Sequence, residues 1–117
     1  ASACRTRPIV EPATTVPPGL TSDQVKHGIL MASSRRHWMA RETGEGKIRA
    51  LIEVRGKHSA ETEITYDART YQIRYVSSEH LMHSESGKIH KGYNGWVIKL
   101  DRTIRQELLR AARKDEQ

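Results

Sequence analysis

The sequence contains no phenylalanine, one cysteine and no proline after residue 18. Two Trp and four Tyr are its only aromatic residues, so Ile, Leu, Val and Ala must supply most of a core. A single cysteine excludes an internal disulfide. No apolar run approaches the ~18 residues of a membrane-spanning helix. A Gly-x-Ser-x-Gly elbow and a phosphate-binding Gly-rich loop are also missing, so neither a serine hydrolase nor a P-loop enzyme is predicted.

The composition fits one small domain of 117 residues with a basic surface. The formal net charge is +6 and the isoelectric point is near 9.8. Such a balance favours anionic partners, for example nucleic acid, phospholipid headgroups or polyanionic polymers. The alternative is a solvated surface that only keeps the protein soluble. The Lys and Arg residues are spread along the chain and form no single run.

The N-terminal segment differs from the rest of the chain. Residues 1–19 hold all four prolines, mixed with Thr and small residues. Proline lacks a backbone donor and has a fixed φ, so we predict a flexible tether here, outside the fold. Residues 20–113 are then predicted to form a single domain, followed by a polar tail at 114–117.

The tether carries the only cysteine. Ala1-Ser2-Ala3-Cys4 resembles the end of a bacterial lipobox, in which small residues precede a cysteine that receives lipid. A lipidated Cys4 would anchor the protein stably in a membrane. Because Arg5 and not Asp follows the cysteine, the predicted location is the outer membrane of a bacterial envelope, with the domain facing the periplasm. The alternative is an inert thiol.

Sequence patterns predict the elements of the domain. Thr21 and Gln24 form a capping-box pattern, so a helix is expected from about residue 22 to Ser34. A short strand follows near Trp38. Clear alternation then predicts strands at 47–54 and 58–66, with a fourth strand around Tyr71 to Tyr75. Short loops between these strands indicate an antiparallel meander, with Lys47 and Arg49 opposite Glu61 and Glu63.

Helical spacing from Tyr93 to Ala111 predicts a long C-terminal helix. The predicted fold class is therefore α+β: a helix, a four-stranded antiparallel meander, a long loop and a C-terminal helix, packed as a two-layer sandwich.

The expected loop between Ser77 and Gly92 is long for a compact domain, which is typical of functional or disordered segments. It contains His80, His83 and His90, and these three imidazoles are a possible zinc site of a metal-dependent hydrolase. The loop lacks the His-Glu-x-x-His pattern of a helical metal site, so polar surface histidines are the preferred interpretation. No metal or other cofactor is predicted.

The segment Ile89-His90-Lys91-Gly92-Tyr93-Asn94-Gly95-Trp96-Val97 is dense in aromatic and polar residues. It resembles a recurring segment in a family of small, uncharacterised proteobacterial lipoproteins. Further matching positions are Trp38, Tyr71, Ile73, Tyr75, Ser78 and Leu81. The resemblance covers about residues 22–109 and implies an envelope lipoprotein, but it implies no activity.

The segment suggests one candidate binding site. Its members are His90, Lys91, Tyr93, Asn94 and Trp96. The alternative is structural, with Tyr93 and Trp96 anchoring the helix while Asn94 caps it or ties down the loop.

These observations predict a lipid-anchored periplasmic domain without catalysis, acting in interaction or envelope maintenance. Its expected contacts are the membrane, through lipid on Cys4, and either another envelope protein or an anionic envelope polymer. A basic nucleic-acid-binding domain is the second alternative beside the hydrolase, and the tether argues against it.

Overall fold

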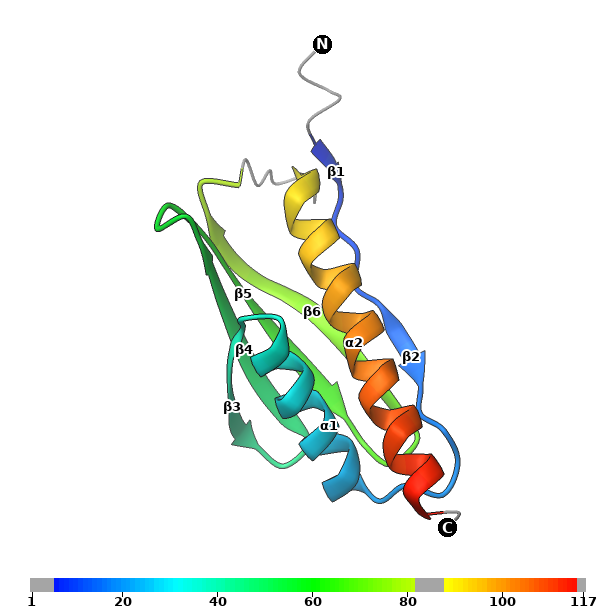
Figure 1. Cartoon of the computed structure of the whole chain (residues 1–117). Helices are drawn as coiled ribbons and strands as arrows, with labels where there is room; N and C mark the ends of the chain where they lie inside the picture. Colours follow the sequence, from blue (N-terminus) through cyan, green and yellow to red (C-terminus); the bar gives the residue numbers. More distant parts are fainter. Residues whose placement is uncertain (1–5, 82–87, 116–117) are drawn as a thin grey trace.

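The computed structural model describes residues 6–81 and 88–115, and it confirms the predicted α+β sandwich. A five-stranded antiparallel sheet has the order β2-β6-β5-β4-β3, and a separate two-stranded sheet pairs β1 with β7. Both helices lie side by side against one face of the larger sheet (Figure 1). The core lies between these two layers.

The elements follow the chain in a simple order. They are β1 Thr6–Pro8, β2 Ala13–Thr15, α1 Ser22–Arg35, β3 Met39–Gly44, β4 Lys47–Val54, β5 His58–Tyr66, β6 Thr70–Glu79, β7 Lys88–His90 and α2 Lys91–Asp115. The four predicted strands correspond to β3, β4, β5 and β6, so the meander is present with an additional edge strand, β2, beside β6.

The start of α1 is the predicted capping box. The Thr21 hydroxyl accepts a hydrogen bond from the Gln24 backbone N–H at 3.1 Å, and the Gln24 side chain accepts one from the Thr21 N–H at 2.8 Å. These bonds satisfy donors that a helix N-terminus otherwise leaves unpaired. The helix then buries Val25, Ile29 and Ala32 against the sheet.

Alternation along the strands places apolar side chains toward the helices. Ile48, Ile64 and Ile73 share one register line across β4, β5 and β6, and all three are fully buried. On the other face Arg49 contacts Glu61 at 2.7 Å and Glu63 at 3.3 Å, which confirms the predicted charge pairing for this residue. Lys47 instead lies opposite Thr65.

The prediction that residues 1–19 form a tether outside the fold is wrong for the part that the structure describes. β2 pairs with β6, β1 pairs with β7, and Val16 is buried in the core. The prolines are compatible with this because edge positions need few backbone donors. Pro12 contributes as an acceptor, since its carbonyl receives the Ile73 N–H at 3.0 Å.

The predicted loop at 77–92 is also too long at both ends. β6 extends to Glu79, while β7 occupies residues 88–90 and α2 begins at Lys91. The His90 N–H donates to the Leu81 carbonyl at 2.8 Å, so the two ends of the connection meet. The predicted C-terminal tail begins inside α2, which continues to Asp115.

Candidate functional site

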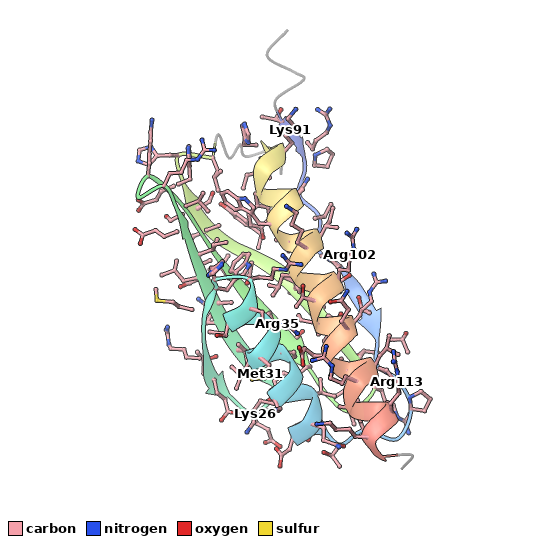
Figure 2. All side chains as sticks on the ribbon, viewed as in Figure 1. Lys26, Met31, Arg35, Lys91, Arg102 and Arg113 are labelled. Atoms are coloured by element: carbon pink, nitrogen blue, oxygen red, sulfur yellow. The ribbon has the colours of Figure 1, made fainter. Side chains whose placement is uncertain are left out.

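The structure separates the five residues of the predicted binding site. His90 and Trp96 line a cavity of about 330 Å³ where the β4–β5 hairpin faces the start of α2. Lys91 is exposed at the first position of α2 (Figure 2). Tyr93 and Asn94 are both buried. The separation follows from helix geometry, because consecutive residues point about 100° apart.

Tyr93 and Asn94 have structural environments. The Tyr93 ring meets Tyr75 edge-on, with ring centroids 5.6 Å apart, and its hydroxyl is buried with no hydrogen-bond partner among the described residues. Burial raises the pKa of Tyr93 above its ordinary value. The Asn94 side chain donates to the Pro8 carbonyl at 2.9 Å and accepts from the Val10 N–H at 3.1 Å. Asn94 thus fastens the N-terminal segment to α2.

Two histidines at the cavity are held by backbone groups. His58 Nδ1 lies 2.7 Å from the His80 carbonyl, so this nitrogen must donate a proton. His90 Nδ1 accepts the Gly92 N–H at 3.0 Å, so in the neutral ring the proton is on Nε2. The two imidazoles are therefore fixed in opposite tautomers.

The alternative metal site gains no support from these positions. No group of three or more His, Cys, Asp or Glu side chains gathers in the part of the chain that the structure describes. His80 is exposed, and the Nδ1 of His90 is already paired with Gly92. His83, like Cys4, lies outside the described residues.

A buried carboxylate that sequence reasoning missed joins three elements. Asp101 on α2 accepts hydrogen bonds from the Tyr71 hydroxyl at 2.6 Å and the Thr14 hydroxyl at 2.9 Å. Arg105, one turn further, contacts the other carboxylate oxygen at 2.8 Å. Burial, followed by the bond to Asp101, raises the pKa of Tyr71, and the same carboxylate raises the pKa of Arg105. This network ties β2 and β6 to α2.

The folded chain gathers its excess positive charge on the helix layer. Among the side chains that the structure describes, residues 22–36 and 91–114 carry ten Lys and Arg and three carboxylates. Two of these carboxylates, Asp101 and Glu107, have side chains only 6% and 11% exposed. The remaining described side chains include eight cations and eight carboxylates. Almost all of the net charge therefore lies on one of the two layers.

The cations of α2 follow its outward side. Lys91, Arg102 and Arg113 are spaced by 11 residues, which is about three helical turns and ~16 Å of rise. All three project from the helix away from the sheet (Figure 2). Lys99 and Arg110 repeat the same 11-residue interval between them. We call these five residues the basic ridge.

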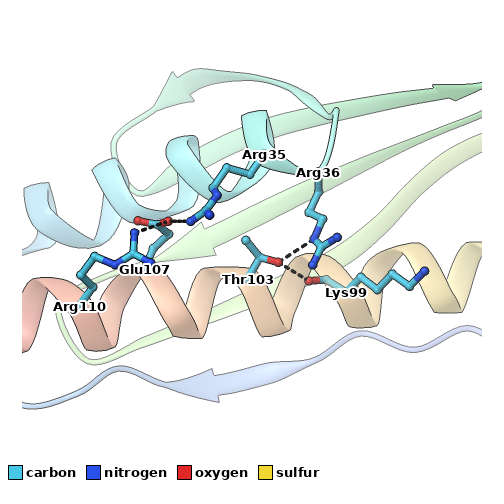
Figure 3. A network of polar contacts seen from close by, with 6 residues as sticks. All are labelled: Arg35, Arg36, Lys99, Thr103, Glu107 and Arg110. Atoms are coloured by element: carbon cyan, nitrogen blue, oxygen red, sulfur yellow. Dashed lines mark hydrogen bonds and ion pairs between the residues drawn. The ribbon is translucent and has the colours of Figure 1, made fainter.

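Two arginines at the end of α1 widen the basic ridge (Figure 3). The Arg36 Nε donates to the Thr103 hydroxyl at 2.8 Å, and Thr103 donates in turn to the Lys99 carbonyl at 2.9 Å. Glu107 accepts from both Arg35 and Arg110. A polar hollow of about 210 Å³ lies between Arg35, Arg36, Thr103 and Gln106. The arginines are thus oriented by hydrogen bonds within the helix layer.

The sequence contains the signal for the ridge, since the 11-residue interval is visible in it. The full basic surface is not evident from the sequence, because its cations come from α1 and α2, which are far apart in the sequence but adjacent in space.

Comparison with known proteins assigns neither a family nor a function to the chain. No protein-family model, curated protein or solved structure matches the chain. Within the described residues, no helix is both long and apolar enough to cross a membrane.

Proposed function

We propose that this domain is a non-catalytic binding module that holds an extended anionic polymer on its helix layer. The observation that carries the proposal is the segregation of charge between the two layers. A surface that only provides solubility has both signs interspersed, as the described residues outside the helices do. The helix layer instead presents a row of cations along most of α2, which suits repeated negative charges on a linear partner.

The proposal includes a place in the bacterial envelope. A lipid on Cys4 would leave only Arg5 between the anchor and β1, because β1 begins at Thr6. The domain would then sit close to the membrane surface and meet an envelope polymer there. An acidic envelope protein is the other partner class compatible with the same charge.

Charge reversal on the ridge tests the polymer-binding function. We expect Lys99→Glu/Arg102→Glu/Arg113→Glu to weaken binding of fluorescein-labelled heparin at least tenfold, measured by anisotropy at 50 mM salt. The slope of log K against log salt concentration should also decrease, because fewer counterions are released. All three residues are exposed, so the fold should persist.

The matched control is Arg41→Glu/Lys47→Glu/Arg74→Glu, on exposed positions of the sheet. Both variants lower the formal net charge from +6 to zero. The control should lose less than threefold in affinity. Equal losses would show that only net charge matters, and the ridge would not be a site.

If duplex DNA of equal charge binds the wild type tenfold tighter than heparin, the ligand is nucleic acid and the proposal of an envelope polymer is wrong.

Lipidation of Cys4 has its own test. The full natural gene, expressed in a bacterial host with labelled palmitate, should give a labelled protein in the membrane fraction, and Cys4→Ser should abolish the label. An unlabelled wild-type protein would remove the anchor from the proposal without affecting the ridge.

A further inference from the structure

The cavity at the end of the sandwich has the size and walls of a small-molecule site. Its volume of about 330 Å³ lies at the lower end of the usual range for ligand pockets. One wall comes from the β4–β5 hairpin and the other from the start of α2. The described lining residues are Val54, Arg55, His58, Leu81, His90, Gly92 and Trp96.

Most of the wall is apolar. Leu81 is only 3% exposed, while Val54 and Trp96 are half-buried. Gly92 keeps the space open, because a Cβ atom there would lie 3.1 Å from His90 Nδ1 and 4.0 Å from Trp96 Cζ2. The indole of Trp96 and the imidazole of His90 thus border a position without a side chain. Such a wall fits an aromatic ring.

Among the described residues, the polar groups of the wall carry no negative charge. His58 and His90 each use Nδ1 for a backbone partner, which fixes the ring orientations and leaves each Nε2 available. Arg55 supplies a cation, and no carboxylate is found among the described lining residues. Charge complementarity therefore favours an acidic ligand.

Arg55 occupies a backbone position that suits other residues better. Its φ is +59° and that of Gly56 is +64°, and the Lys57 N–H donates to the Val54 carbonyl at 3.3 Å. A turn with positive φ at both central residues prefers Asn, Asp or Gly at the first. An arginine in the left-handed region costs conformational energy. Backbone strain at a residue whose side chain lines a cavity suggests that the side chain has a role in binding there.

We infer that this cavity binds a small amphiphilic anion, meaning a molecule with an aromatic ring system and one acidic group. The ring lies against Leu81 and Trp96, and the acidic group pairs with the Arg55 guanidinium, which matches carboxylate and phosphate geometry. The His90 Nε2–H adds a hydrogen bond to the acidic group, whereas the neutral His58 ring, which carries its proton on Nδ1, offers its Nε2 only as an acceptor. No residue of the basic ridge is among the described lining residues, although Lys91 adjoins His90 and Gly92 in the chain, and the site does not depend on the proposed polymer-binding function.

The test uses 1-naphthyl phosphate as the probe and the indole N–H signal of Trp96 as the reporter. Trp38, which is buried in the core, supplies a reference signal, and Trp96→Phe assigns the two. In ¹H–¹⁵N spectra the probe should shift the Trp96 signal saturably and leave Trp38 unchanged. Inorganic phosphate and 1-naphthol, which each have one half of the probe, should bind at least tenfold more weakly.

Arg55→Asn is expected to make the folded state more stable. Asparagine suits the turn, so the melting temperature should rise, while affinity for 1-naphthyl phosphate should fall at least fivefold and affinity for 1-naphthol should not change. Arg55→Gly, which the turn also accepts, serves as the second variant. The ridge variant Lys99→Glu/Arg102→Glu/Arg113→Glu should bind the probe like the wild type.

Four results would overturn the inference. The first is the absence of any saturable Trp96 shift, as expected if the chain itself fills the cavity. The second is equal binding of 1-naphthyl phosphate and 1-naphthol. The third is unchanged affinity in both Arg55 variants. A loss of probe binding in the ridge variant would assign the phosphate to the helix layer instead, which also contradicts the inference.

Discussion

Replacing Asp101 with alanine is expected to lower the free energy of unfolding by about 3 kcal/mol. The substitution removes the carboxylate that accepts from both the Tyr71 and Thr14 hydroxyls, and it leaves the buried phenol only its longer contact to the backbone carbonyl of residue 101, at 3.2 Å. Arg105 also loses its ion pair, but its side chain is 59% exposed and water replaces the contact. The dominant cost therefore comes from the buried Tyr71 hydroxyl and the half-buried Thr14 hydroxyl.

Thermal unfolding of the Asp101→Ala variant should show a melting temperature lower by roughly 10–15 °C. Amide hydrogen exchange should speed up first in β2, which the network holds to α2, and only later in β4 and β5. Asp23→Ala is the control, because that carboxylate is 90% exposed on α1 and should have little effect. Unchanged exchange in β2 would show that the network does not hold the edge strand.

The two buried tyrosines are expected to respond in opposite directions to the loss of one oxygen atom. Tyr93→Phe should raise the free energy of unfolding by about 1 kcal/mol, since its hydroxyl is desolvated and has no partner among the described residues. Tyr71→Phe should lower it by about 2 kcal/mol, because that hydroxyl donates to a buried carboxylate. Urea unfolding of both variants measures the difference. Effects of the same sign would contradict the assigned environments.

These tyrosines also predict the behaviour at high pH. Burial raises the pKa of both phenols, so the folded state holds these protons more tightly than the unfolded state. Their contribution to stability is fully present below the unfolded pKa of about 10 and is lost as the pH rises above it. The free energy of unfolding of the wild type should fall more steeply with pH above about pH 10. Tyr93→Phe should make this decrease smaller. An unaltered pH profile in Tyr93→Phe would contradict the role of this phenol.

The regular part of the fold was predictable because burial is periodic there. β4 and β5 alternate cleanly, and α1 begins at a capping box that two residues specify. β1 and β2 were not predictable, because each has three residues and lies beside prolines. Their pairing depends on distant partners, which local patterns do not encode.

The candidate site was only half predictable for a related reason. The segment 90–96 is rich in aromatic and polar residues, so the sequence identifies its members as candidates for a site. Once residues 91–96 form the first turns of a helix, however, their side chains face different surroundings. His90 and Trp96 reach a cavity whose other wall, with Arg55 and His58, lies more than thirty residues earlier. The Asp101 network likewise needs Thr14 and Tyr71, which no spacing rule connects.

The attachment of the N-terminal segment has a consequence for the order of folding. Thr6 pairs with His90, Ala13 pairs with Gln72, and the Asn94 side chain binds Val10. These contacts join the N-terminal segment to parts of the chain that are synthesised much later. β1 and β2 must therefore remain unpaired during synthesis until β7 and β6 have followed. Contacts with such large sequence separations slow folding, so closure of this segment is expected to be the final step.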